Sequence, residues 1–183
     1  MSTNMNGGVA ANAEAMVAKA ADAILGQCSS FIESLPDHAY VVDSKTLKGG
    51  TCGKHVRHIL DHYSAIFVGV DTGEPIMYDR RERHVPMETS RSAAVATIAE
   101  LRGRLAPKNC PRLSDAVSVQ VMLSGDGTEA ELQSTLAREL AFATHHAIHH
   151  HAMLKAIAQE FGVDAGSEFG KAPSTINFEK AGT

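Results

Sequence analysis

Histidine is the residue type whose number and spacing point most directly to chemistry in this chain of 183 residues. Ten histidines are present, and eight of them lie in two short stretches, residues 55–62 and 145–151. Imidazole is a good ligand for zinc, nickel, iron and copper. Two histidines four residues apart on a helix point in the same direction and can bind one ion together. The two stretches therefore predict a divalent-metal site with ligands from two helices.

The later stretch contains two pairs with this spacing, His145 with His149 and His146 with His150. The helical face through His146 and His150 also carries Glu139 and several apolar residues, whereas the other face is more polar. The more apolar face is expected to turn inward. The pattern therefore favours His146 and His150, and it places the carboxylate of Glu139 about two turns before the pair.

The earlier stretch offers three candidates for a third ligand, His55, His58 and His62. Hydrophobic periodicity places His55 and His62 closer to the apolar stripe than His58, so periodicity alone does not select His58. A site with three histidine ligands leaves coordination positions open for water or a substrate, as in catalytic zinc sites. The remaining histidines of both stretches could instead bind additional ions, which would favour metal storage.

Helices are expected to carry both stretches, because apolar residues recur there at helical spacing. Thr51 is suited to cap the helix that begins near Gly53, and Ser90 is suited to cap the next one. Val117, Val119 and Val121 recur with the period of two that is typical of a strand. The turn signal at 125–127 would let residues 129–133 return as the second strand of a small β-hairpin. The predicted elements are helices over residues 9–35, 53–70, 90–105 and about 135–161, and strands over residues 117–122 and 129–133.

These elements predict a single domain over residues 9–162. The expected fold class is all-α, a four-helix bundle with a small β-hairpin before the last helix. A disordered tail is expected over residues 1–8 and a polar C-terminal tail over residues 163–183. The long connection over residues 71–89 is expected either to be functional or to cross one end of the bundle.

Composition and charge exclude several classes of function. The formal net charge is −4 and the pI is near 6.2, so no basic face suited to nucleic acid is expected. Arg80, Arg81 and Arg83 alternate with acidic residues and are interpreted as part of a solvated loop. No apolar run reaches the roughly 20 residues of a membrane span, and the N-terminus lacks a signal-peptide pattern. Widely separated cysteines fit a reducing cytoplasm, where the protein is expected to act.

Both histidine stretches resemble segments of the DinB-like (DinB/YfiT) family of metal-binding four-helix bundles, over roughly residues 10–178. The matching segments are Lys54-His55-Val56-Arg57-His58-Ile59-Leu60-Asp61-His62-Tyr63, Glu139-Leu140-Ala141-Phe142 and His146-Ala147-Ile148-His149-His150-His151-Ala152. The resemblance implies one metal ligand from the second helix, His58, and a pair from the last helix, His146 and His150. Family members include thiol transferases that use mycothiol- or bacillithiol-type cofactors, and a related domain of sulfoxide synthases that make thiohistidines.

The function that this resemblance implies is that of a divalent-metal-binding DinB-like enzyme, a thiol S-transferase or a hydrolase, acting on a small molecule such as a low-molecular-weight thiol. The ion would be zinc, nickel or iron, and it could lower the pKa of a bound water or thiol. Glu139 and Asp61 are the candidates for a general base or for a group that orients a ligand. The alternative is a non-catalytic protein for metal binding or sensing, or a stress-related interaction protein. A homodimer is expected, because two-fold dimers are the commonest assembly of soluble chains.

Overall fold

Helices make up most of the described chain, as the sequence predicts. The computed structural model describes residues 5–80 and 85–182, with side chains from residue 12 onward. The elements of this part of the chain are, in order, α1 (Met5–Ser34), α2 (Asp37–Val41), α3 (Cys52–Thr72), β1 (Ile76–Met77), α4 (Pro86–Thr89), α5 (Arg91–Leu105), β2 (Ala116–Met122), β3 (Glu129–Thr135), α6 (Leu136–Gln159) and α7 (Pro173–Ala181).

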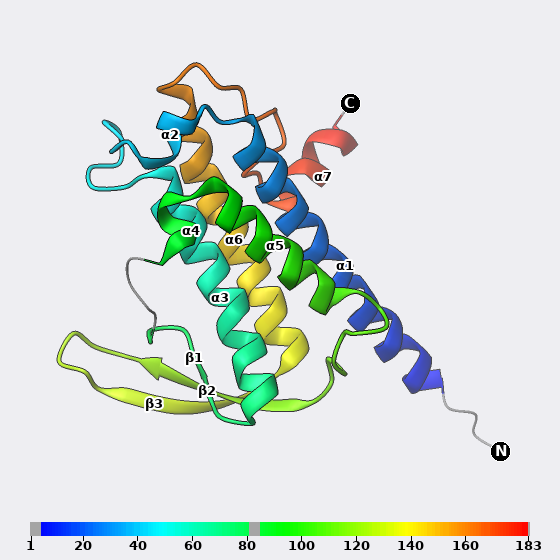
Figure 1. The fold of residues 1–183 in the computed structure, drawn as a ribbon. Coiled ribbons are helices and arrows are strands. Elements are labelled where there is room, and N and C mark those ends of the chain that lie inside the picture. The colour runs from blue at the N-terminus through cyan, green and yellow to red at the C-terminus, as the bar shows by residue number, and fades with distance from the viewer. Residues whose placement is uncertain (1–4, 81–84, 183) are drawn as a thin grey trace.

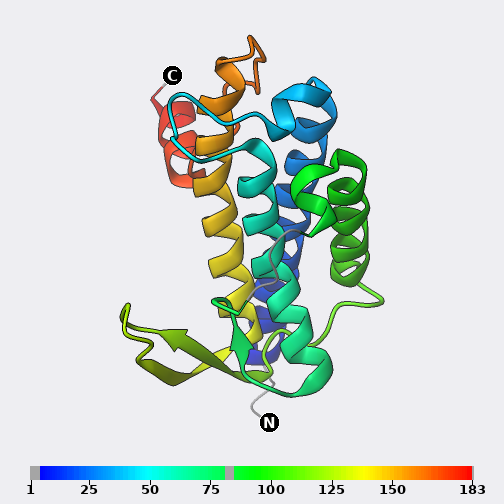
Figure 2. The same cartoon turned by 60° about the vertical axis from the view of Figure 1, so that its left-hand side comes forward.

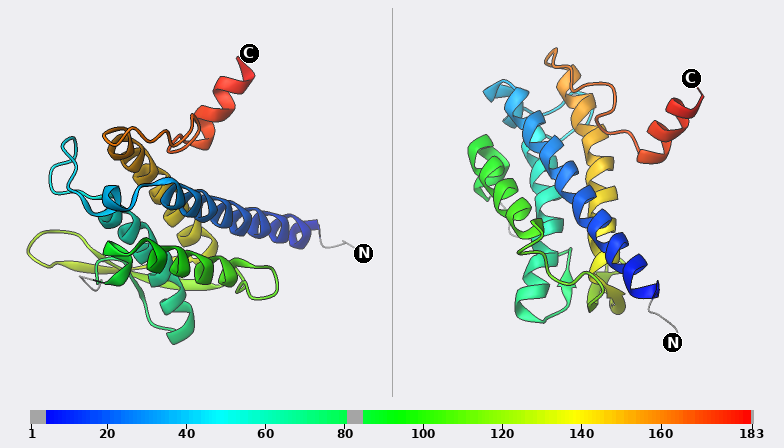
Figure 3. Two further views of the ribbon diagram at one scale, coloured as in Figure 1. Left: turned by 45° about the horizontal axis from the view of Figure 1, so that its top comes forward. Right: turned by 90° about the vertical axis from the view of Figure 1, so that its right-hand side faces the viewer.

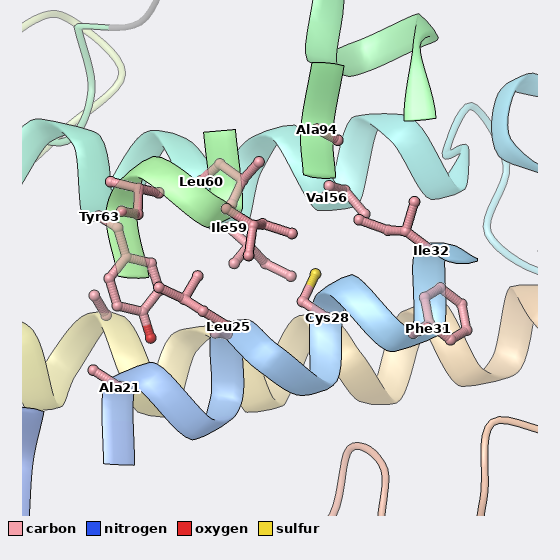
Figure 4. Packing of buried hydrophobic residues seen from close by; sticks show 14 of the residues in the cluster. Ala21, Leu25, Cys28, Phe31, Ile32, Val56, Ile59, Leu60, Tyr63 and Ala94 are labelled. Carbon is pink, nitrogen blue, oxygen red and sulfur yellow. The ribbon is translucent and has the colours of Figure 1, made fainter. Parts of the chain in front are cut away.

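The four long helices, α1, α3, α5 and α6, lie side by side (Figures 1 and 3). α3 packs on α5 and α6, and α1 also packs on α5 and α6. Apolar side chains fill the space between them, as Figure 4 shows for Leu25 and Ile32 of α1 and for Ile59 and Leu60 of α3. Burial of this apolar surface is the main force that holds the helices together.

The helices that carry the histidine stretches begin where the sequence predicts. Thr51 precedes α3, and its hydroxyl oxygen accepts a hydrogen bond of 3.0 Å from the Lys54 N–H. Thr135 precedes α6 and accepts from the Arg138 N–H at 3.3 Å. Ser90 caps α5 in the same way. Each cap satisfies an N–H group that the first turn of a helix leaves without a partner.

A three-stranded sheet in the order β1-β2-β3 crosses one end of the long helices (Figures 1 and 2). β2 and β3 form the predicted hairpin, with Val119 opposite Leu132 in antiparallel register. β1 adds a short parallel strand, with Ile76 opposite Val119. The sequence does not reveal β1, because two residues are too few to show an alternating pattern. The all-α class is therefore too narrow a description of this chain.

Four segments that the sequence predicts as tails or connections contain helix. α1 begins at Met5 and so overlaps the predicted disordered tail over residues 1–8, whose first four residues lie outside the described chain. Once a helix has formed, each further residue adds a hydrogen bond, and the helix can extend upstream of its apolar pattern. α2 and α4 lie in predicted connections and α7 lies in the predicted C-terminal tail. Helices this short leave little periodic signal in the sequence.

No described helix is both long enough and apolar enough to cross a membrane. The arginine-rich segment of the predicted solvated loop is described only in part. Arg80 is exposed and lies 3.6 Å from the carboxylate of Glu129, whereas Arg81 and Arg83 lie outside the described residues.

Candidate metal centre

The seam between α3 and α6 holds both histidine stretches, and Figure 2 shows the two helices side by side. A buried hydrogen-bond chain aligns them. The Tyr63 hydroxyl donates to Thr144 Oγ1 at 3.2 Å, and the Thr144 hydroxyl donates to the Leu140 carbonyl at 2.7 Å. Gly53 lets α4 approach the start of α3, because a Cβ there would lie 1.9 Å from the Glu88 carbonyl oxygen. Contacts outside the histidines therefore help to set the register of the two helices.

Three imidazoles meet across this seam, His58 from α3 and His146 and His150 from α6. One ring nitrogen of each lies within 4.8 Å of the other two. His146 Nε2 lies 2.9 Å from His58 Nε2, and the ring of His150 lies 4.6 Å from each of the other rings. His58 and His146 are half-buried and His150 is buried, so this group lies at the edge of the core. The structure thus brings together the three residues that the resemblance implies as ligands.

Exposure distinguishes the two possible pairs on α6. His145 and His149 are exposed, whereas His146 is half-buried and His150 is 8% exposed. The more apolar face of α6 therefore turns inward, as its sequence predicts.

Burial favours the neutral form of both α6 imidazoles in the group. It lowers the pKa of His150 to about 3 and that of His146 to about 4, with repulsion from neighbouring imidazoles as a smaller cause in each case. A histidine must be neutral to bind a metal ion. At neutral pH neither ring therefore has to lose a proton before it can act as a ligand.

The donor set fits a divalent ion of borderline character. Two nitrogens that each lie 2.0–2.1 Å from a tetrahedral zinc ion are about 3.3 Å apart, close to the 2.9 Å between the Nε2 atoms of His58 and His146. The third nitrogen lies within 4.8 Å of both. The group contains no cysteine and no carboxylate, and three protein ligands would leave a coordination position open.

Aromatic rings flank the group on the side of the sheet. His62 is buried and stacks on His146, with ring centroids 4.2 Å apart, and on Tyr78 at 5.0 Å. Its Nδ1–H donates to the carbonyl oxygen of His58 at 2.9 Å. Phe142 lies 5.9 Å from the ring of His146 and 5.4 Å from that of Tyr78. These rings, named here the aromatic wall (His62, Tyr78 and Phe142), hold one side of His146 in place.

Comparison with known proteins shows a partial likeness to a curated protein. No protein-family model matches the chain, and no solved structure matches it. FK506-binding protein 5 from Rhizopus delemar is 35% identical to this chain over 104 residues, which make up 56% of this chain. The match covers 27% of that protein, so the chain spans about a quarter of the length of this relative. The histidine group is therefore interpreted from its own geometry.

Glu139, the first candidate for a general base, is buried beside the sheet at 1% exposure. Its Oε1 accepts hydrogen bonds from the Ser134 hydroxyl at 2.5 Å and from Arg138 Nη1 at 2.9 Å, and its Oε2 accepts from the Tyr78 hydroxyl at 2.8 Å. Burial and this carboxylate raise the pKa of Tyr78, which keeps the phenol a donor. The link from Glu139 to the three imidazoles runs through Tyr78 and then His62.

Asp61, the second candidate, pairs with a cation on its own helix. Its Oδ2 lies 3.9 Å from Nε of Arg57, which in turn lies 3.3 Å from the carboxylate of Glu88 on α4. Asp61 does not belong to the group that could hold an ion. The structure places it at the contact between α3 and α4.

One side chain near the group, Tyr78, was not predicted from the sequence, and one histidine of the later stretch, His151, lies outside the group. Tyr78 lies in the long connection between α3 and α5, and the length of that connection was the only signal for it. His151 is fully buried, and its ring stacks on Phe169 with centroids 4.4 Å apart. Burial lowers the pKa of His151 to about 4. His151 therefore belongs to the packing of the C-terminal segment and not to the group of three.

Proposed function

We propose that this chain is a DinB-like four-helix-bundle protein that binds one divalent ion, zinc, nickel or iron, through His58, His146 and His150. The observation that carries the proposal is the meeting of three imidazoles from two helices, with one ring nitrogen of each within 4.8 Å of the others. The family resemblance of both histidine stretches supports the same three residues. The low pKa values of His146 and His150 support it further, because both rings are available as neutral ligands.

We further propose that the site belongs to a metal-dependent enzyme, a thiol S-transferase or a hydrolase, that acts on a small molecule. A divalent ion held there would supply Lewis acidity to a ligand in its open position. The Phe142 ring is 38% exposed and offers that ligand an apolar surface beside His146. Tyr78 and Glu139 hold this part of the aromatic wall in place. A low-molecular-weight thiol is a suitable substrate class, because sulfur is a good zinc ligand.

A non-catalytic role in metal binding or sensing, or in a stress-related interaction, is the second candidate. It is favoured by two further imidazoles beside His150, those of His55 and His149, with ring centroids 5.2 and 5.5 Å away. Such neighbours could bind additional ions. The homodimer and the cytoplasmic location expected from the sequence are part of either proposal.

The metal content of the protein, purified without a histidine tag, tests the proposed site. We expect about one tightly bound ion per chain, and we expect His146→Ala and His150→Ala each to lose it, because two remaining imidazoles make a weak site. His145→Ala and His149→Ala are matched controls on the same helix and should keep the ion, because both side chains are exposed. Wild-type metal content in both His146→Ala and His150→Ala would refute the assignment.

Turnover separates the two candidate functions. The metal-loaded protein is incubated with a small thiol and an electrophile, and consumption of the thiol is compared with that in the His146→Ala variant. Metal-dependent consumption supports the enzyme. A zinc titration that shows several weak sites, together with no turnover, supports storage or sensing.

A further inference from the structure

A contact between His55 and His150 lies next to the group of three. His55 precedes His58 by nearly one turn of α3, and its Nδ1 lies 3.0 Å from Nδ1 of His150, with ring centroids 5.2 Å apart. This distance is that of a hydrogen bond between two ring nitrogens. One nitrogen must therefore donate a hydrogen and the other must accept it.

The direction of this hydrogen bond decides which nitrogen of His150 can bind an ion. When His150 donates its Nδ1 hydrogen, the neutral ring keeps a lone pair on Nε2. When His55 donates, the lone pair on Nδ1 of His150 is used in the hydrogen bond, and Nε2 carries the hydrogen. A neutral His150 then has no lone pair left for an ion. Only the first direction is compatible with a ligand.

We propose that His55 accepts the Nδ1 hydrogen of His150 and thereby holds Nε2 of His150 as the ligating atom. This inference rests on the proposed function, to which it adds a positioning residue outside the ligand set. In most protein metal sites a carboxylate, a backbone carbonyl or a water orients a histidine ligand through its second nitrogen. Here an imidazole from the facing helix fills that role.

The loop before α3 fixes the place of His55. A Cβ on Gly50 would lie 3.0 Å from His55 Nε2, so the loop backbone packs closely against the far edge of this ring. The Ser44 N–H donates to the Gly50 carbonyl at 2.8 Å, and the Ser44 hydroxyl donates to Glu160 at 2.6 Å. Glu160 also accepts from the next two backbone N–H groups of the loop. Because Glu160 lies at the end of α6, it ties the loop that holds His55 to the helix that carries His150.

Zinc affinity, measured by competition with a chromogenic chelator, tests the role of His55. Leucine has a similar size but cannot accept a hydrogen bond, whereas the amide oxygen of asparagine stands near the position of Nδ1 and can accept one. We expect His55→Leu to bind zinc about 10–100-fold more weakly than the wild type, and His55→Asn to recover most of that loss. His145→Leu is the matched control on an exposed site and should bind as the wild type does. Equal affinity of His55→Leu and the wild type would overturn the inference.

The tautomer of His150 gives a readout that a general loss of packing would not produce. Nitrogen-15 NMR of the ring nitrogens should show the hydrogen on Nδ1 and a bare Nε2 in the metal-free protein, and zinc on Nε2 in the loaded one. A hydrogen on Nε2 in the metal-free protein, or zinc on Nδ1, would overturn the inference. If the wild type binds neither zinc, nickel nor iron, the proposed function fails, while the tautomer of the metal-free protein still decides the role of His55, so the two failures are distinguishable.

Discussion

Replacement of Phe169 by alanine tests whether the C-terminal segment is part of the folded core. The sequence predicts this segment as a polar tail. Phe169 is 8% exposed, and its ring lies between Phe31 of α1 at 4.8 Å and His151 of α6 at 4.4 Å, nearly parallel to both. A buried phenylalanine removes roughly 200 Å² from water, which corresponds to about 5 kcal/mol at about 25 cal/mol per Å². Residual burial in the unfolded chain lowers this value. We therefore expect Phe169→Ala to lower the free energy of unfolding by about 3–5 kcal/mol.

Urea-induced unfolding, followed by circular dichroism in the metal-free protein, measures this loss. Phe178→Ala is the matched control, because Phe178 lies in the same C-terminal segment but is 79% exposed. We expect that control to change the free energy of unfolding by no more than about 0.5 kcal/mol. If both variants lose the same small amount, the stack of Phe169 between α1 and α6 does not hold the C-terminal segment in solution.

Two further predictions concern buried ionisable side chains. The Glu139→Ala variant should keep the bound ion but lose about 2–4 kcal/mol of unfolding free energy, because the part-buried hydroxyls of Tyr78 and Ser134 lose their acceptor. Any turnover should also change in this variant. Loss of the ion would contradict the indirect link through Tyr78 and His62. The second prediction concerns His151, because burial lowers its pKa from 6.5 to about 4. Below pH 6.5 the unfolded chain takes up a proton at this residue but the folded chain does not. The stability is therefore complete above pH 6.5 and falls by up to about 3 kcal/mol as the pH falls to about 4. His151→Phe keeps the ring stack and should lack this part of the pH dependence in metal-free unfolding, whereas a stability difference from the wild type that stays constant with pH would contradict the assignment.

Local signals in the sequence were sufficient to predict where the helices that carry the histidines begin. Thr51 and Thr135 accept hydrogen bonds from N–H groups three residues ahead, and such caps depend on residues close in sequence. The preference for His146 and His150 also came from a local pattern, the apolar face of one helix. β1 could not be found in this way, because it depends on a parallel contact with β2 that is distant in sequence. Tyr78 directly follows β1 and could not be placed without it.

Periodicity does not select His58, the ligand that we propose on this helix, for a physical reason. Hydrophobic spacing measures how far a side chain points into the core, and by that measure His62 is indeed the more buried residue. A metal ligand on one helix must instead reach across a seam to meet ligands on the next, so it lies at the edge of the apolar stripe. His58 is half-buried and meets His146 there. The family resemblance supplied this residue, and helical spacing alone did not.

The helical pattern predicted on which face of α6 Glu139 lies, but it could not predict the hydrogen-bond partners of this residue. Its position on the inward face of α6 was predicted, but its partners are Tyr78, which directly follows β1, and Ser134 of β3. A carboxylate on such a face can point into a pocket or into the core, and only tertiary partners decide between them. Here three donors satisfy the carboxylate within the protein, which makes it a support for the aromatic wall.

The two α6 imidazoles of the group are supported from opposite ends of that helix. Near the start of α6, Glu139 holds Tyr78, and Tyr78 and His62 stack in turn toward His146. At the end of α6, Glu160 holds the loop that packs on His55, and His55 contacts His150. Each support begins at a carboxylate that accepts hydrogen bonds from a segment outside the long helices. The two routes share no residue, and the seam itself is aligned by a third contact, the hydrogen bond between Tyr63 and Thr144.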